Sequence, residues 1–430
     1  MMNPRGQASK CYLPSARRAG CPVLRAASAA CFALLSLKAA AQQPYRPHSA
    51  AVQSFHDAVA AAWARLPQRQ DLAAQGVSAA ARYAAGGAFL PNAPYVIGTY
   101  FNDKAVGSNY NYLTAQAEVG TPIWLPGQGR ATQATARADG IAVEAAIEAA
   151  HLALAAQVLD LAAQASVAAN ARDVAARRLT TAQSLSTDLA RQFRVGEAAQ
   201  SDALAASADA ANTAITLSNA EAQLAAAQAA LAAVVGTPAV PRLDAPGPAP
   251  GPIPASAHPR IIAATRAVEA AQASARLTRI DIRDSPEIGL QGINEKQPNS
   301  KWDTRFGVTI RFPFATEARN APRRAAAEQA ITQAMVQLTV AQREVAAGLQ
   351  QAQAMLAGAE RSSAASIRAA AELDKRRGQI ERAWRVGEMP LIEVVRANAL
   401  AYDAEYARDK ARTDLAAARL RLRLAAGLLP

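Results

Sequence analysis

Two carboxylates at matching positions are the side chains with the clearest capacity for chemistry. Asp202 and Glu393 each lie six residues after the glycine of an Arg-Val-Gly-Glu segment. Carboxylates grouped at a narrow opening bind cations and set ion selectivity. An acid also suits the first turn of a helix, where it faces the positive end of the helix dipole. The two roles are compatible, and neither of them is covalent catalysis.

The segment that precedes each carboxylate occurs twice, 191 residues apart. An aromatic residue comes directly before each copy, Phe193 in the first and Trp384 in the second. Pro94 and Pro122 also have counterparts, 192 and 191 residues later. Landmarks in one order with one spacing indicate two tandem copies of a single unit. The two segments consist of Arg194, Val195, Gly196 and Glu197, and of Arg385, Val386, Gly387 and Glu388.

Long helices are expected to position these segments. Alanine, the best helix former, fills 114 of the 430 positions. Proline-free stretches predict helices at about 131–193 and 323–385, each ~63 residues or ~95 Å long. Returning helices are expected at about 201–235 and 391–426, and shorter helices at 53–82 and 260–277, before the strands. Because glycine suits a helix end, each copy is expected to be a helical hairpin with the Arg-Val-Gly-Glu segment as its turn.

Alternating segments of about ten residues precede the long helices. We expect strands at about 94–102 and 110–125 in the first copy, and at about 286–293 and 304–314 in the second. In the last segment, apolar side chains such as Phe306 alternate with polar ones such as Arg305. An apolar face opposite a polar face at this length is typical of a transmembrane strand. A soluble hairpin with one buried face has the same pattern, so the strands alone favour neither interpretation.

The number of strands limits how they can lie in a membrane. Four strands cannot close a barrel, and an open sheet edge in lipid leaves backbone donors and acceptors unsatisfied. Strands that span a membrane would therefore have to share one barrel among several chains. Because eight strands from two chains leave little room inside, a conduit favours three or more chains, and three give twelve strands.

Residues before and between the two copies differ from them in composition. Residues 1–41 hold six basic residues, no acid, a short apolar core and a run of small residues, which predicts a secretory signal peptide cleaved near Ala41. Its removal takes all three cysteines and lowers the net charge from +12 to +6, which weakens any case for nucleic-acid binding. Residues 236–259 hold eight prolines and are expected to form an extended linker between the copies at 42–235 and 260–430.

Enzyme signatures are missing from the sequence. The four histidines lie far apart, without the spacing of metal ligands. The chain has no phosphate-binding glycine loop and no Gly-x-Ser-x-Gly segment. We therefore expect a protein that is not an enzyme and that holds no cofactor and no catalytic metal.

These residues together resemble the TolC-like family of outer-membrane efflux proteins. The resemblance covers the chain from about residue 54 to its end. It is carried by Leu90-Pro91-Asn92-Ala93-Pro94, Thr121-Pro122-Ile123-Trp124-Leu125, Ala257-His258-Pro259 and the two Val-Gly turns. The region of Pro122 with Gly127-Gln128-Gly129-Arg130 looks most similar to the branch that serves heavy-metal and small-molecule pumps.

The resemblance implies a homotrimer in the outer membrane of a Gram-negative bacterium that extends into the periplasm. Its fold would be mainly α with a transmembrane β part, in which a twelve-stranded barrel continues into a periplasmic α-helical barrel. The implied partners are outer-membrane lipid, a periplasmic adaptor (membrane fusion) protein and an inner-membrane pump. The two Arg-Val-Gly-Glu segments would contact the adaptor at the periplasmic tip.

The resemblance also assigns a gate. Asp202 and Glu393 match positions at which the family lines the closed pore entrance with carboxylates. The chain departs from the family pattern nearby, because Arg396 stands in place of a second acid and Met389 in place of a basic residue that helps to latch the gate. The sequence offers a substitute for this latch, which is a contact between Arg396 and an acid of a neighbouring hairpin.

The implied function is that of a passive channel in a tripartite efflux system that exports metal cations or small toxic compounds. The outer-membrane duct of a type I protein secretion system has the same architecture and stays open as an alternative. A periplasmic coiled-coil adaptor or scaffold without a pore is an alternative of another class. The class of the neighbouring pump would decide the cargo.

Overall fold

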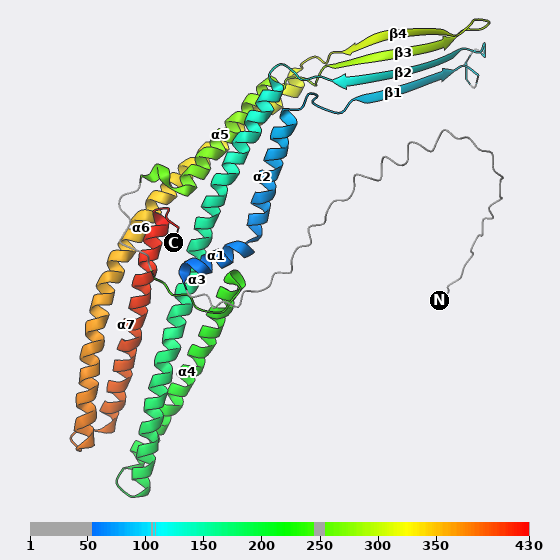
Figure 1. The fold of residues 1–430 in the computed structure, drawn as a ribbon. Helices are drawn as coiled ribbons and strands as arrows, with labels where there is room; N and C mark the ends of the chain where they lie inside the picture. The colour runs from blue at the N-terminus through cyan, green and yellow to red at the C-terminus, as the bar shows by residue number, and fades with distance from the viewer. Residues whose placement is uncertain (1–53, 105, 108, 245–253, 430) are drawn as a thin grey trace, which may run out of the picture. The chain divides into compact units, whose positions relative to one another are not determined.

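The computed structural model describes residues 54–104, 106–107, 109–244 and 254–429. The predicted signal peptide at 1–41 and residues 245–253 of the predicted linker lie outside them. The described residues belong to one unit, Ala51–Pro430. They are mainly helical with a small antiparallel sheet (Figure 1), which confirms the coarse fold predicted from the sequence.

Long helices form one hairpin in each sequence repeat. α3 (Gln128–Arg194) returns as α4 (Gln200–Val235), and α6 (Glu317–Arg385) returns as α7 (Leu391–Ala425). α3 has 67 residues, which is ~100 Å at ~1.5 Å per residue, and α6 has 69 residues. α6 begins before the predicted start at 323 and passes through Pro322. Pro322 is the sixth residue of this helix, so it removes the backbone hydrogen bond to the carbonyl of Ala318, and the helix continues through it.

Three shorter helices lie beside the long ones, between the sheet and the middle of α3 (Figure 1). They are α1 (Phe55–Arg65), α2 (Pro67–Gly86) and α5 (Pro259–Ile280). The sequence predicts one helix across 53–82, but the structure breaks it at Leu66, whose backbone is extended at φ −67° and ψ 118°. The break has a steric cause, because a proline disfavours helical backbone in the residue before it. α2 packs along α3, and α5 packs along both α3 and α6.

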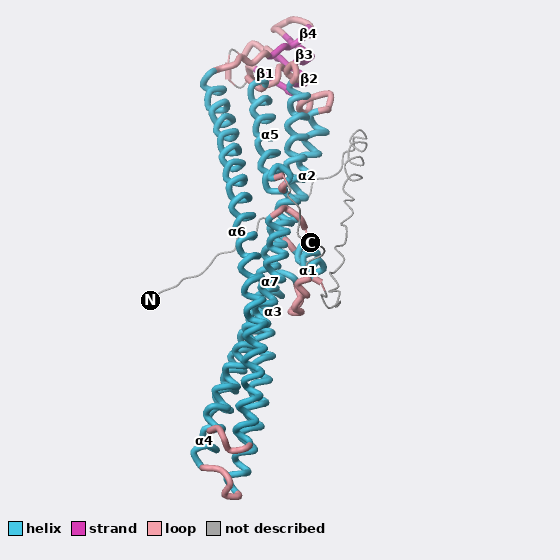
Figure 2. The backbone as a smooth tube through the Cα atoms, turned by 90° about the vertical axis from the view of Figure 1, so that its left-hand side faces the viewer, coloured by secondary structure: helices cyan, strands magenta, loops and turns pink. Residues whose placement is uncertain are grey.

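The strands form a four-stranded antiparallel sheet in chain order within the described residues. They are β1 (Tyr95–Asn102), β2 (Leu113–Pro122), β3 (Glu287–Lys296) and β4 (Asp303–Arg311). β2 of the first repeat pairs with β3 of the second, so one sheet joins the two repeats (Figures 1 and 2). β1 and β4 are the edges of the sheet.

Two strands end earlier than the sequence predicts. β2 covers residues 113–122 of the expected 110–125, and β4 ends at Arg311, so that Phe312 and Phe314 lie beyond the ladder. Pro313 lies between these two phenylalanines and has no N–H to donate, which accounts for the end of the ladder.

The main apolar core lies where α1, α3, α4 and α7 meet. Leu159 of α3, Leu231 of α4 and Leu420 of α7 are almost completely buried there. Alanines between them let the helices approach closely. Trp63 of α1 stacks on His151 of α3 at 4.7 Å between ring centroids, so this histidine is a packed residue of the helical seam.

Candidate functional site

The two Arg-Val-Gly-Glu segments form turns of the same geometry. α3 ends at Arg194 and α6 at Arg385; Gly196 and Gly387 both have φ of +83°. In each turn the glycine N–H and the following N–H donate to carbonyls of the last helical turn, at 2.9 to 3.0 Å. This is the Schellman arrangement of a helix end, which needs a residue with left-handed backbone and therefore favours glycine.

The ends of the two hairpins differ in packing. Trp384 packs into an apolar cluster with Leu189 and Leu391, whereas Phe193, its counterpart in the first repeat, is 42% exposed. Val195 and Val386, which precede the turn glycines, are 66% and 72% exposed. Each turn therefore presents one exposed valine at the end of its hairpin.

Asp202 and Glu393 lie in the first turns of the returning helices α4 and α7. Their carboxylates therefore face the positive ends of these helix dipoles, as one of the two sequence interpretations requires. Glu393 accepts a hydrogen bond from Arg396 of its own helix, at 2.6 Å between Nη1 and Oε1. In a single chain, Arg396 is thus paired within its own helix.

A groove runs along α3 between α4 and α7. It consists of two adjoining cavities of about 320 and 500 Å³, both lined by Ala171, Gln223 and Tyr406. Asp202 precedes Gln223 of the α4 wall by three steps of seven residues, and Arg396 precedes Lys410 of the α7 wall by two such steps. Seven residues fall ~20° short of two helical turns, so Asp202 and Arg396 lie ~60° and ~40° away from Gln223 and Lys410 about their helix axes, and neither is among the residues that line this groove.

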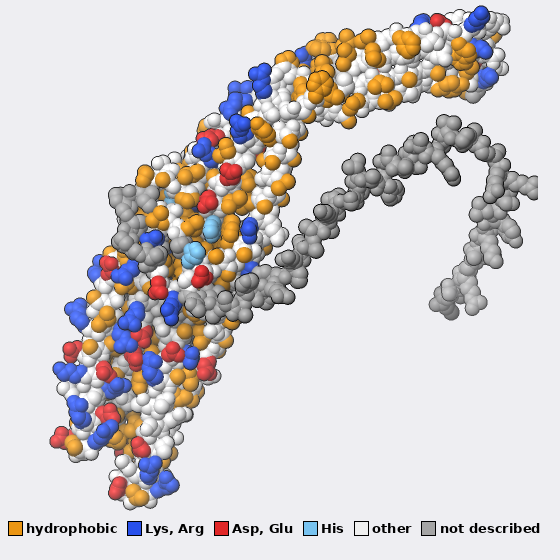
Figure 3. Space-filling model, in the orientation of Figure 1, with side chains coloured by type: hydrophobic (Ala, Val, Ile, Leu, Met, Phe, Trp, Pro, Cys, Tyr) orange, Lys and Arg blue, Asp and Glu red, His pale blue; other side chains and the backbone are white. Residues whose placement is uncertain are grey.

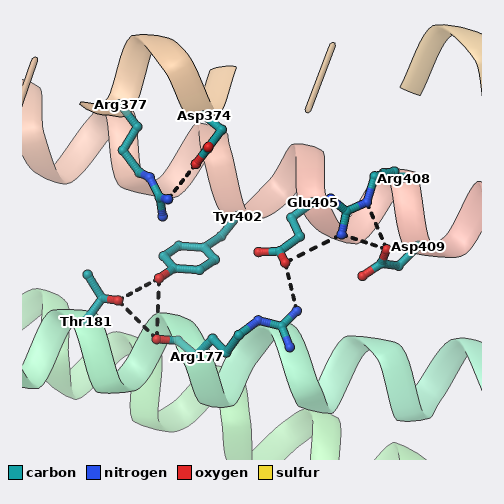
Figure 4. A network of polar contacts seen from close by, with 8 residues as sticks. All are labelled: Arg177, Thr181, Asp374, Arg377, Tyr402, Glu405, Arg408 and Asp409. Carbon is teal, nitrogen blue, oxygen red and sulfur yellow. Dashed lines mark hydrogen bonds and ion pairs between the residues drawn. The ribbon is translucent and has the colours of Figure 1, made fainter. Parts of the chain in front are cut away.

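Polar contacts between α3 and α7 hold the two repeats together beside this groove (Figure 4). The hydroxyls of Thr181 and Tyr402 lie 2.6 Å apart. Arg177 of α3 donates to Glu405 of α7, at 3.0 Å between Nη2 and Oε1. No sequence motif marks these residues, and the two pairs join positions 221 and 228 residues apart in the chain, so the sequence alone does not predict them.

The sheet has one apolar and one mainly polar face. The register places Val96, Val119, Leu290 and Val308 in one row across the strands, all of them 55% to 73% exposed. Most of the apolar residues that alternate along the strands therefore share one face of the sheet. Figure 3 shows many hydrophobic side chains over the strands.

Hydrogen bonds and ion pairs cross the opposite face. Tyr95 donates to Glu287 at 3.0 Å, and Arg311 lies 3.5 Å from the same carboxylate. The Tyr95 ring fills the space over Gly120, where an added Cβ would lie 2.5 Å from the ring. Arg305 pairs with Glu295 further along this face. Ile97, Phe101 and Ile293 are apolar exceptions on this face.

His258 is buried at the start of α5 and caps this helix. Its Nδ1 accepts a hydrogen bond from the backbone N–H of Arg260, at 3.2 Å. Burial lowers the pKa of His258 below its usual value, and the positive charge of Arg260 lowers it further. The neutral ring that the cap requires is therefore the favoured form. This role is structural, and the described residues contain no group of three His, Cys, Asp or Glu that could hold a metal ion.

In TolC-like outer-membrane channels, a small open sheet is combined with helical hairpins, and the long helix of each hairpin comes directly after a pair of strands in the chain. Solved structures of this fold match the chain over 87% of its length. They include a membrane protein from Pseudomonas aeruginosa (TM-score 0.68, 18% identity, 90% of that chain covered) and the Campylobacter jejuni CmeC outer-membrane channel (0.69, 14%, 85%). Another is the open state of the Neisseria gonorrhoeae MtrE outer-membrane channel (0.65, 18%, 89%).

No protein-family model and no curated protein sequence matches the chain. The identities to the solved structures are low, so the likeness shows a shared fold. At the level of the fold, the resemblance stated from the sequence is confirmed.

Proposed function

We propose that the chain is one subunit of a homotrimeric outer-membrane channel, the passive outlet of a tripartite efflux system. The observation that carries this proposal is the sheet, with an exposed apolar face, a polar opposite face and two open edges. In water, such a face would be an aggregation hazard. In a bilayer, the apolar face meets lipid and the polar face lines the lumen.

The dimensions of the sheet and its aromatic residues support the same assignment. Strands of 8 to 10 residues span ~26 to ~33 Å, which matches the ~25 Å apolar band of outer-membrane barrels. Aromatic residues are exposed beyond both ends of the strands, as the interfacial girdles of such barrels require. They are Tyr110, Tyr112 and Trp302 near the loops, and Phe312 and Phe314 near the helices.

The open edges support the trimer. Edge strand β4 of one copy would pair with β1 of the next, and three copies would close a barrel of twelve strands. The helical hairpins of three copies would then line a periplasmic tunnel. At its tip, residues 194–197 and 385–388 would contact an adaptor protein held by an inner-membrane pump.

The gate would be formed by three copies each of Asp202, Glu393 and Arg396. Because Arg396 pairs with Glu393, it offsets the charge of that carboxylate, and Asp202 would dominate the field at the entrance. The cargo that we propose is metal cations or small toxic compounds, which a cation-attracting entrance and a wide tunnel both allow.

Conductance of the purified protein in a planar bilayer tests the channel. We expect stable pores and a trimer in detergent. Asp202→Asn should lower the preference of the pore for cations more than Glu393→Gln does, and Glu221→Gln, on the exposed side of α4, should leave it unchanged. A monomer without conductance would support the scaffold alternative and overturn the proposal.

The cargo needs a test in cells. A strain without this chain should accumulate metal ions or dyes when the pump is active, and the restored chain should lower this accumulation. Unchanged accumulation together with loss of a secreted polypeptide from the medium would assign the channel to type I secretion instead.

A further inference from the structure

The loop between α5 and β3 holds an arginine that pairs with no carboxylate among the described residues. Arg283 lies between Asp281 and Asp284 in the chain, and α6 binds both of these acids. Asp281 pairs with Arg323 at 2.6 Å. Asp284 pairs with Arg319 at 2.8 Å.

The other acids of this region are paired as well. Residues 279–287 and 311–328 together carry five acids and six arginines. The remaining pairs are Glu287 with Arg311, Glu317 with Arg324, and Glu328 with Arg279. One positive charge is therefore left over in these two segments, and it belongs to Arg283.

Arg283 lies against the edge of the apolar sheet face. The central carbon of its guanidinium is 4.2 Å from the centroid of the Phe312 ring. Phe312 is the first residue after β4 and continues the alternation of Val308 and Ile310, so this stack lies where the apolar band ends.

One nitrogen of this guanidinium lacks a hydrogen-bond acceptor. The Nε of Arg283 is buried and has no partner among the described residues, although the residue as a whole is only half-buried. A charged donor that is removed from water without an acceptor is unfavourable. An anion from outside the chain would therefore stabilise the side chain in this position.

The loop that carries Arg283 is held in place by both long helices. Asn320 of α6 is itself buried and donates to the carbonyl of Ile282 at 2.9 Å. Arg323 donates to the carbonyl of Asp281 at 2.9 Å, and Gln128 of α3 donates to its carboxylate at 3.3 Å. Because the loop is fixed in advance, a ligand of Arg283 would not have to order it on binding.

A neighbouring copy does not supply the missing acid. In the proposed barrel, β4 pairs with β1 of the next copy, so residues 87–94 of that copy would lie nearest to Phe312. They contain no charged residue. The one acid of the preceding helix α2 is Asp71, 15 residues before its end at Gly86 and so ~22 Å away along the axis.

We propose that Arg283 binds the phosphate of a phospholipid in the periplasmic leaflet, with the acyl chains of the lipid along the apolar sheet face. A guanidinium offers a planar fork of N–H groups that matches two oxygens of a phosphate, and the stack on Phe312 fixes the plane of this fork. One phosphodiester carries the single negative charge that this region lacks. Figure 3 shows Lys and Arg side chains gathered where the sheet meets the helices. The inference rests on the proposed function in one respect, since the apolar face must meet lipid.

Counting bound lipids on the purified full-length protein tests this proposal. The protein in detergent is titrated with phosphatidylglycerol, and the lipids that it retains are counted by native mass spectrometry. One control ligand is a diacylglycerol with the same acyl chains and no phosphate, and the other is inorganic phosphate, which has no chains. We expect one phosphatidylglycerol per subunit, bound about tenfold or more tightly than either control.

Variants assign the binding to Arg283. Arg283→Gln should weaken the binding of phosphatidylglycerol about 10- to 100-fold, because it removes charge-assisted hydrogen bonds. Arg283→Lys keeps the charge without the planar fork and should bind about threefold or more weakly than the unaltered protein. Arg276→Gln removes the same charge from an exposed residue of α5, two helical turns further from the sheet, and should change binding less than about twofold.

Several results would overturn the inference. Equal weakening by Arg283→Gln and Arg276→Gln would reduce the effect to overall charge, and inorganic phosphate that binds as tightly as the lipid would make Arg283 a site for a free anion. If the Gln variant does not assemble, the Lys variant decides, and unweakened binding by it would contradict the role of the guanidinium. Pores whose lipid retention is independent of residue 283 would sink this inference alone, whereas a monomer without pores would sink the proposed function.

Discussion

Placing an arginine on each face of β4 tests which face meets lipid. Val308 lies on the apolar face and is 63% exposed. Its neighbour Gly307 lies on the opposite face, where a Cβ added to the glycine would have no other atom within 4 Å. Val308→Arg and Gly307→Arg therefore add the same charge to adjacent residues without steric conflict. Only the surroundings of the two faces differ.

The expected cost follows from the depth of Val308. It lies three residues from Arg311 and five from Asp303, or ~10 and ~17 Å from the ends of the strand. An arginine near the middle of the lipid face of a barrel costs ~2–4 kcal/mol. We expect Val308→Arg to destabilise the inserted protein by ~2–3 kcal/mol, about 30- to 150-fold in the insertion equilibrium. Gly307→Arg, in an aqueous lumen, should change it by less than ~0.5 kcal/mol.

Insertion into phosphatidylcholine vesicles over a urea series measures both variants, with tryptophan fluorescence as the signal. Equal midpoints for the two variants would refute the lipid-facing assignment of the Val96–Val308 row. A larger cost for Gly307→Arg would place the polar face, instead of the apolar one, against a dry surface.

Three other predictions concern the helical part. The pKa of His258 is lowered in the folded protein, so the stability that this residue contributes is complete above ~6.5, the pKa of histidine in the unfolded chain, and is lost as the pH falls below that value. The melting temperatures at pH 5 and pH 7.5 should therefore differ less in His258→Asn, which keeps the helix cap, than in the unaltered protein. Gly387→Ala, at φ +83°, should cost ~1 kcal/mol in urea unfolding, whereas Gly358→Ala, inside α6 with open space around it, should stabilise by ~0.5–1 kcal/mol. Leu420→Ala, 1% exposed, should cost ~2–5 kcal/mol by the same measurement, and Ile215→Ala, 60% exposed, should cost less than ~1 kcal/mol.

The local features of the fold could be predicted because single residues determine them. A glycine after a long alanine-rich stretch marked both hairpin turns, and alternation marked the strands and their two faces. The sequence did not predict the break at Leu66, although Pro67 carries the signal for it. It also placed the end of β4 too late, because the alternation of Phe312 and Phe314 continues past Pro313 while the hydrogen bonds do not.

The contacts between the repeats could not be predicted from the sequence, for a different reason. Thr181 and Tyr402 are ordinary residues on two helices, and only the packing of α3 on α7 brings their hydroxyls together. The pairing of Arg396 with Glu393 follows an i, i+3 spacing that the sequence contains, whereas we expected a partner on a neighbouring hairpin.

The near-equal lengths of α3 and α6 constrain how such a protein can change size. The two helices start beside one sheet and end in hairpins whose apolar residues next to the turns pack together, and the helices differ by only two residues, or ~3 Å. A heptad inserted into one arm alone would offset its turn by ~10.5 Å and pull Leu189 away from Leu391. Insertions or deletions that preserve this packing must therefore change the two descending and the two returning helices by the same length. The lengths of the two repeats are thus expected to change together in evolution.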